Sequence, residues 1–150
     1  GEIFDRYIKT EKVLFTYKDL PLSFHPNAEP AAHAAYCAGE QEKYFQMHEL
    51  MFEFGNFWTE EKDPFPVFKK FAKALKLQKS EFKKCFEEKR YTGVIEKGIE
   101  EAEKAGVTGT PGFLINEESV SGAQPFFAFQ QIIERLLQNQ AKPAETAETK

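Results

Sequence analysis

Cysteine is scarce in this sequence: its 150 residues include two, Cys37 and Cys85, and no C-x-x-C pair. Neither cysteine has a second cysteine three residues away, so neither supplies the dithiol of a redox motif by sequence. Three histidines, His25, His33 and His48, lack the spacing of metal ligands, so we predict no metal site. The sequence implies no organic cofactor either.

Long apolar runs and an excess of positive charge are also missing. No run approaches the roughly 18 apolar residues of a membrane-spanning helix, and the first residues lack the basic and apolar regions of a signal peptide. Twenty Lys and Arg residues are scattered among 24 Asp and Glu residues, which gives a net charge of −4. We therefore predict no membrane span in this chain and no nucleic-acid partner, because no basic patch can neutralise phosphates.

Phenylalanine, in contrast, is abundant: the chain has 16 Phe residues against one Trp. Hydrophobic residues make up 41% of the sequence, which is typical of a globular protein and excludes a disordered chain. The length suits one core, and the composition predicts that phenylalanine fills most of it.

Helical periodicity dominates the first two thirds of the chain. Residues 3–8 carry one apolar stripe and predict the end of a helix, with no start signal before it. The alanine-rich residues 28–38 predict a helix that packs closely against another. Further apolar stripes predict four more helices, around residues 47–54, 64–75, 82–86 and 94–102, the last of which ends at Gly106.

Strands are predicted before and after this helical block. Val13–Tyr17 is β-branched and aromatic with apolar side chains on both faces, as in a strand inside a mostly parallel sheet. Residues 113–115 and 120–122 flank a polar turn and predict an antiparallel hairpin. A last helix is predicted from Pro125 to Gln138, and residues 139–150, which lack large apolar side chains, are predicted to be disordered. The pattern predicts an α/β fold with an inserted helical block.

The segment from Gly106 to Asn116, GVTGTPGFLIN, resembles the cis-proline loop and following strand of DsbA-like, thioredoxin-fold thiol:disulfide oxidoreductases. Taken alone, its Gly-Thr-Pro-Gly sequence also fits an ordinary turn. Other segments resemble further signatures of the same family: VLFTYKDLP (13–21), HPNA (25–28), CAGEQ (37–41) and SGAQP (121–125). The resemblance spans residues 7–137.

This resemblance implies a thioredoxin-like fold in two parts. Residues 1–22 and 107–138 would form an incomplete thioredoxin-like part, and residues 23–106 an inserted helical domain. In the family a C-x-x-C pair opens the first helix, where the helix dipole stabilises the thiolate. We expect this chain to begin inside that helix, so that it is N-terminally truncated and lacks the first strands and the C-x-x-C segment.

The resemblance also assigns roles to four residues. Thr110 and Pro111 would contact the substrate polypeptide, and Cys37 and Cys85 could form a structural disulfide. Such a bond closes a loop of about 50 residues and would add on the order of 4 kcal/mol in the chain-entropy model. The alternative is two buried free thiols that pack as small hydrophobic side chains. A disulfide would favour a periplasmic or otherwise extracytoplasmic location.

Two further groups of residues are candidates for function. The paired acids Glu60-Glu61, Glu87-Glu88 and Glu100-Glu101 lie in lysine-rich helical stretches, so we interpret them as solvated surfaces rather than as acid–base catalysts. The aromatic residues from Phe52 to Phe71 should be mostly core. The part from Phe54 to Trp58 could instead leave an apolar patch for client polypeptides.

Three functions follow from the resemblance. The first is dithiol–disulfide exchange with protein substrates by a complete protein, assisted by a redox partner protein, while this chain alone is redox-inactive. The second is a redox-inactive DsbA-like module that binds polypeptides. The third is a glutathione-using relative with an upstream serine. Whether the complete protein would oxidise, reduce or isomerise is left open. An unpaired strand also predicts self-association by strand exchange between copies.

Overall fold

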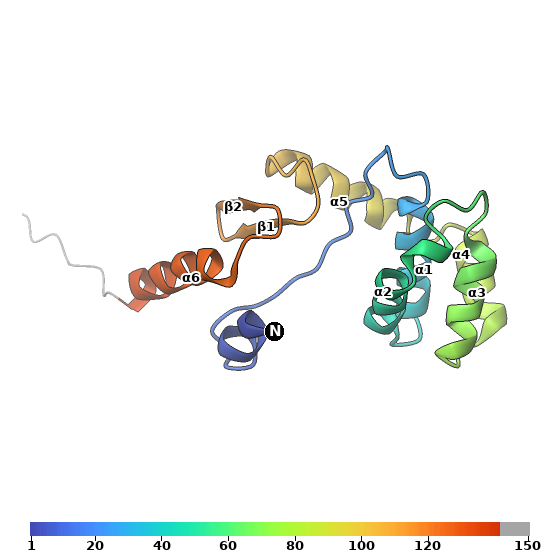
Figure 1. Cartoon of the computed structure of the whole chain (residues 1–150), viewed down its shortest axis with the longest axis horizontal. Helices are drawn as coiled ribbons and strands as arrows, with labels where there is room; N and C mark the ends of the chain where they lie inside the picture. Colours follow the sequence, from blue (N-terminus) through green and yellow to red (C-terminus); the bar gives the residue numbers. More distant parts are fainter. Residues whose placement is uncertain (142–150) are drawn as a thin grey trace, which may run out of the picture. The chain divides into compact units, whose positions relative to one another are not determined.

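A computed structural model describes residues 1–141 (Figure 1). The elements, in chain order, are η1 (Phe4–Ile8), α1 (Ala28–Gly39), α2 (Tyr44–Glu53), η2 (Gly55–Phe57), α3 (Phe65–Ala74), α4 (Lys79–Glu87), α5 (Thr92–Lys104), β1 (Gly112–Ile115), β2 (Glu118–Ser121) and α6 (Phe126–Ala141). They form two compact units. Unit 1 contains residues 1–17 and the described residues from 105 onward, and unit 2 contains residues 18–104.

Unit 2 is a bundle of helices built around α1. The alanine side chains of α1 are small, so neighbouring helices can approach its backbone closely. Helices α2, α3, α4 and α5 all contact it. Ala34 and Ala38 are fully buried there. The large side chains of this core come from the partner helices, including Phe68 of α3 and Phe82 of α4. Each buried phenylalanine contributes roughly 1.5–3 kcal/mol through the hydrophobic effect.

Helix α3 has the amphipathic pattern that its sequence predicts. Phe68 and Phe71 are buried, whereas Lys69 and Lys70 between them are exposed. Just before the helix, the Asp63 carboxylate accepts a hydrogen bond from the backbone N–H of Phe65 over 3.0 Å. This bond satisfies one of the free N–H groups at the helix start.

A buried asparagine fixes the loop that precedes α3. The side-chain amide of Asn27 donates hydrogen bonds to the backbone oxygens of Trp58, Thr59 and Glu61 over 2.8 to 3.1 Å. The indole N–H of Trp58 in turn donates to the backbone oxygen of Met51 over 2.9 Å. The loop is therefore held to the residue before α1 and to α2.

Unit 1 contains the hairpin and α6. Strands β1 and β2 pair antiparallel, with Gly112 opposite Ser121 and Ile115 opposite Glu118. The turn uses Asn116 in the left-handed region (φ 55°), which asparagine tolerates better than most residues. Phe113 of β1 packs edge-on against Phe129 of α6, with ring centroids 4.8 Å apart.

Helix α6 continues beyond Gln138, the residue at which its apolar stripe predicts its end. Residues 139–141 are helical rather than disordered, because an established helix propagates through polar residues at little cost. The rest of the predicted disordered segment, residues 142–150, lies outside the described residues.

The predicted strand at Val13–Tyr17 is not a strand in the structure. This segment is extended backbone without a ladder partner, and the sheet in the described part of the chain has two strands, β1 and β2. Val13 packs against the core of unit 1, but the Leu14 side chain is 93% exposed. The prediction was wrong because it rested on the side-chain pattern alone. A strand also needs hydrogen bonds to a neighbouring strand, and this segment has none within residues 1–141.

Within the described residues, the helices are too short or too polar to serve as a membrane span.

Candidate functional site

The loop from Gly106 to Gly112 leads from α5 into β1 and contains both residues predicted to contact substrate. Gly106 has a φ of 69°, in the left-handed region that favours glycine, so the chain turns sharply where α5 has ended. Thr110 and Pro111 are exposed, and the peptide bond between them is cis.

The loop folds back against its own exit at Gly112. A Cβ atom at this position would lie 2.5 Å from Cγ1 of Val107 and 2.9 Å from the backbone oxygen of Gly109. No side chain fits there without movement of the loop, so glycine is required for this close approach. On the other side, the backbone oxygen of Pro111 accepts a hydrogen bond from the N–H of Gly122 over 2.8 Å. The loop is thus anchored to the residue that follows β2.

Strand β1 begins directly after this loop and has one unpaired edge. Its other edge pairs with β2, and no third strand joins the sheet among residues 1–141. An edge strand presents backbone N–H and C=O groups that can pair with another extended chain. The exposed Thr110 and Pro111 therefore lead directly into a strand with one edge unpaired among the described residues.

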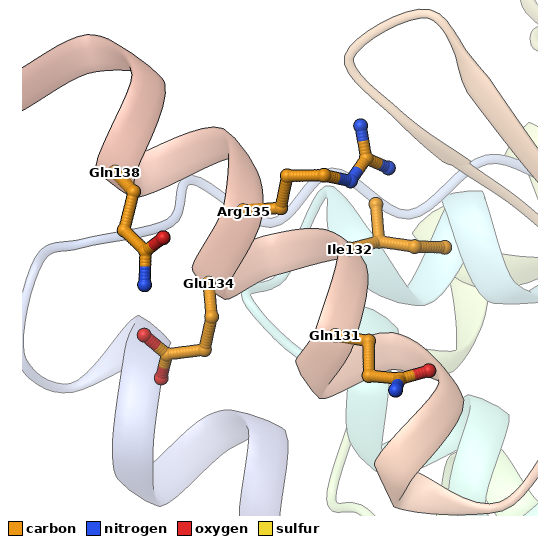
Figure 2. A pocket seen from close by; sticks show the side chains of 5 residues that line it. All are labelled: Gln131, Ile132, Glu134, Arg135 and Gln138. Atoms are coloured by element: carbon orange, nitrogen blue, oxygen red, sulfur yellow. The ribbon is translucent and has the colours of Figure 1, made fainter.

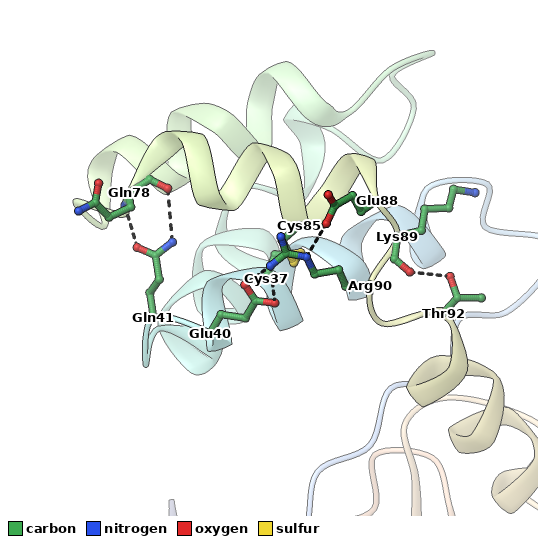
Figure 3. The surroundings of a disulfide bond; sticks show 9 residues. All are labelled: Cys37, Glu40, Gln41, Gln78, Cys85, Glu88, Lys89, Arg90 and Thr92. Atoms are coloured by element: carbon green, nitrogen blue, oxygen red, sulfur yellow. Dashed lines mark hydrogen bonds and ion pairs between the residues drawn. A yellow bond between two sulfur atoms is a disulfide. The ribbon is translucent and has the colours of Figure 1, made fainter.

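The two cysteines form a disulfide that joins α1 to α4 (Figure 3). Cys37 and Cys85 are both fully buried, and their Cα atoms are 5.7 Å apart. Arg90, just past α4, forms ion pairs with Glu40 over 3.0 Å and with Glu88 over 2.7 Å beside the bond. Because both sulfurs are bonded and inaccessible, neither can attack a substrate disulfide while this bond is intact.

His33 on α1 is buried, and neither of its ring nitrogens has a hydrogen-bond partner. Its Nε2 lies 3.8 Å from Oε1 of Glu29, which is too long for a hydrogen bond. Burial lowers the pKa of His33 because it disfavours the charged imidazolium; the positive charge of Lys89 adds to this, and Glu29 opposes it. In the described part of the chain, no three His, Cys, Asp or Glu side chains are grouped so that they could hold a metal ion.

Asp19 is the centre of a tyrosine cluster that the sequence did not indicate. The Tyr44 hydroxyl donates a hydrogen bond to Oδ2 of Asp19 over 2.6 Å. Burial, together with the negative charge of Asp19, raises the pKa of Tyr36 to about 12, and the Tyr36 ring stacks on Tyr91 with centroids 4.9 Å apart. The hydrogen bond from Tyr44 therefore ties Asp19, in the segment before α1, to α2.

The paired acids predicted to be solvated lie at the surface. Glu87 pairs with Lys83 over 3.6 Å and Glu100 with Lys104 over 3.6 Å, in each case one helical turn apart. Glu101 pairs with Lys18. Exposed pairs of this kind contribute little to stability, because water and salt screen the charges.

A shallow, open depression lies on α6, lined by Gln131, Ile132, Glu134, Arg135 and Gln138 (Figure 2). Its charged groups already have partners within unit 1. Glu134 accepts a hydrogen bond from the Tyr7 hydroxyl over 2.6 Å, and Arg135 pairs with Glu118. The depression therefore offers no free charge to a ligand.

The aromatic segment from Phe54 to Trp58 is divided between the core and the surface. Phe54 and Trp58 pack against the core of unit 2, and Phe57 is exposed. The larger exposed aromatic surface lies one element earlier, on α2, where Phe45 and Phe52 face outward. Phe52 belongs to the aromatic stretch that was predicted to be mostly core, so that prediction was wrong for this residue, and Phe45 was not predicted. Their spacing of seven places them on one helix face.

Comparison with known proteins places the chain in a family. The profile of the family described as thioredoxin matches residues 1–135. Two curated relatives are similar over 105 residues, or 69% of this chain: Na(+)/H(+) antiporter NhaA 3 of Salinispora tropica, 31% identical, and Na(+)/H(+) antiporter NhaA 1 of Salinispora arenicola, 30% identical. The match covers 15% of the length of each antiporter. Because the family profile covers most of the sequence, this chain belongs to the thioredoxin family.

Proposed function

We propose that this chain is the substrate-binding part of a DsbA-family thiol:disulfide oxidoreductase that acts on protein substrates, and that the redox cysteines lie outside these 150 residues. One observation carries the proposal: in a thioredoxin-family chain, the exposed Thr110 and Pro111 lead directly into the unpaired edge of β1.

An edge strand is a suitable site for polypeptide substrates. An extended peptide that adds to the edge binds mainly through its backbone, so it binds with little dependence on its sequence. This property fits an enzyme that must act on many unfolded clients. Thr110 and Pro111 would contact the client residues beside the disulfide, and the edge of β1 would pair with the residues that follow.

The proposed reaction is thiol–disulfide exchange in two steps. A cysteine thiolate of the redox pair attacks one sulfur of a client disulfide, forms a mixed disulfide, and releases the other client sulfur as a thiolate. The second cysteine then attacks the mixed disulfide and releases the client as a dithiol. Two electrons pass to the client, the redox pair becomes a disulfide, and a redox partner protein reduces it. The reverse sequence oxidises a client.

The Cys37–Cys85 bond supports a structural role for these cysteines and an extracytoplasmic location. Both sulfurs are fully buried, in contrast to the exposed thiolates that exchange disulfides. Structural disulfides persist in oxidising compartments and are rare in the cytosol. The antiport activity named for the two relatives is not carried over, because this chain matches 15% of each.

A second function, a redox-inactive module that binds polypeptides, is favoured by one specific observation. The sequence has two cysteines and both are bonded to each other, so the chain has no thiol of its own for exchange. Translating the coding DNA upstream of Gly1 in frame separates the two functions. A C-x-x-C pair before Glu2, with insulin reduction by the longer protein, supports the oxidoreductase. A longer protein without a cysteine pair that still binds unfolded clients supports the module.

Site-directed disulfide exchange tests the proposed substrate site on this chain. The two native cysteines are bonded, so Thr110→Cys introduces one reactive thiol, and Thr108→Cys provides a matched control at another exposed loop residue. Each variant is mixed with an unfolded peptide whose cysteine carries thionitrobenzoate, and the released thionitrobenzoate is followed by absorbance. The rate of each variant with the peptide is divided by its rate with a small aromatic disulfide. This ratio corrects for differences in intrinsic thiol reactivity between the two variants.

We expect the corrected rate of Thr110→Cys to exceed that of Thr108→Cys by about tenfold, because a bound peptide has a high effective concentration at the site. Equal corrected rates for the two variants would count against peptide binding at Thr110.

A further inference from the structure

The outer face of α2 exposes two large apolar side chains to solvent. Its inner face buries Met47 and Met51 in the core of unit 2. On the opposite side, Phe45 is 57% exposed and Phe52 is 76% exposed. A helix that is apolar on both sides is normally covered on both sides, and exposed apolar patches commonly mark interaction sites.

The two phenylalanines are held in place by neighbouring rings. Phe45 packs edge-on against Tyr44, with centroids 5.2 Å apart, and Phe52 lies 4.6 Å from the ring of His48. Tyr44 is itself fixed by its hydrogen bond to Asp19. Because their positions are already set, Phe45 and Phe52 would lose little conformational freedom when a partner covers them.

Negative charge accompanies this apolar surface. At 100° per residue, Glu49 lies on the same face as Phe45 and Phe52, and Glu53 lies beside it. Both carboxylates are exposed, and neither forms an ion pair with any other residue in the range 1–141. Helix α2 contains no Lys or Arg. The partner that fits is therefore apolar and positively charged.

We infer that Phe45, Glu49 and Phe52 of α2 form a docking surface for client polypeptide segments in which apolar residues alternate with Lys or Arg. Apolar client residues cover the two rings, and a client cation pairs with Glu49 or lies over an exposed phenylalanine ring. This inference rests on the proposed function, because it names the class of client that the oxidoreductase or binding module takes.

Fluorescence anisotropy of the whole 150-residue chain with labelled peptides tests the inference. The probe is an unfolded peptide of Leu and Phe interspersed with Lys, and the comparison peptide has Glu in place of every Lys. The test variants are Phe52→Ser and Glu49→Lys. The matched controls are Phe127→Ser, at a residue 63% exposed on α6, and Glu103→Lys, on an exposed part of α5. Circular dichroism checks that each variant is folded.

We expect the Lys peptide to bind about tenfold more tightly than the Glu peptide. Phe52→Ser and Glu49→Lys should each weaken its binding by about three- to tenfold, while both controls leave it unchanged. Equal affinity for the two peptides, or equal effects of test and control variants, overturns the inference. A third result would also overturn it: the chain binds neither peptide but self-associates, and Phe52→Ser abolishes this self-association. The surface would then be covered by a second copy of the chain.

The disulfide-exchange experiment at Thr110 separates this inference from the proposed function. If Thr110→Cys reacts preferentially with peptide while the α2 variants have no effect, the proposed function stands and the α2 surface is not used. If the α2 variants weaken binding while Thr110→Cys shows no preference, the surface binds peptide and the proposed loop site is wrong.

Discussion

Cys37 and Cys85 form the covalent link between two helices whose ends are also joined by polar contacts, from Arg90 to Glu40 and between Gln41 and Gln78. The bond joins α1 to α4 over a sequence separation of 48, and both sulfurs lie in the core of unit 2. It closes the loop that contains α2, η2 and α3. The docking surface proposed on α2 therefore lies within the segment that this bond closes.

Removal of the disulfide should destabilise unit 2. The bond restricts the unfolded chain, so the variant Cys37→Ala with Cys85→Ala should lower the free energy of unfolding by about 2–4 kcal/mol. Trp58 is the one tryptophan of the chain and lies in unit 2, so urea denaturation followed by its fluorescence reports on this unit. Reductant should lower the urea midpoint of the natural chain and leave that of the double variant unchanged. An unchanged midpoint in both would contradict a stabilising role.

His33 should make the stability of unit 2 fall as the solution becomes acidic. Its pKa in the folded chain lies below the ordinary 6.5, mainly because it is buried. The unfolded chain therefore binds a proton at His33 near pH 6.5 while the folded chain does not, so stability is lost as the pH falls through about 6.5 toward the folded pKa. We expect His33→Leu to reduce the loss of stability between about pH 7 and about pH 5.

The measurement is urea denaturation at the two pH values, together with the NMR titration of the His33 ring. His25→Leu is the matched control, because His25 is exposed in the turn before α1. The carboxylates are common to all three proteins, so their effects cancel in the comparison. A His33 pKa at or above 6.5 would contradict the prediction, as would equal pH dependence of the two variants.

The elements that the sequence predicts correctly are those with local causes. The stripe of Phe68 and Phe71 behind Asp63 predicts α3, and a helix can be recognised this way because its hydrogen bonds are made within the segment. The β1–β2 hairpin is predicted for the same reason, since its turn at Asn116 brings adjacent residues together. Val13–Tyr17 fails this condition, because the partner of a strand in a parallel-type sheet is distant in sequence.

The residues of the candidate site also differ in whether the sequence alone reveals them. Thr110 and Pro111 are identified by a short motif, and the structure adds that Gly112 permits the loop to close on Val107. Asp19 carries no signal in the sequence, because its role depends on tyrosines from α1 and α2 that approach it only after folding. The α2 surface is missed for another reason: an apolar pattern locates a helix face but does not tell whether that face is covered.

Self-association through the segment at Leu14 is a further prediction. Residues 14–16 are extended, and no backbone hydrogen bond joins them to other residues in the described part of the chain. Leu14 is 93% exposed and Phe15 is half-exposed. Extended backbone with apolar side chains pairs readily with a strand of another molecule. We expect the chain to form dimers or larger species by strand exchange, and Leu14→Lys to shift them toward monomer, because a charge at this position opposes burial in an interface.

Size-exclusion chromatography with light scattering over a range of concentrations measures this shift. Val94→Lys, at an exposed residue of α5 in unit 2, is the matched control and should leave the distribution unchanged. If both variants dissociate the assembly equally, general surface charge rather than the segment at Leu14 is responsible. A natural chain that is monomeric at every concentration would contradict the prediction outright, because the exposed backbone at residues 14–16 would then be stable in water without a partner.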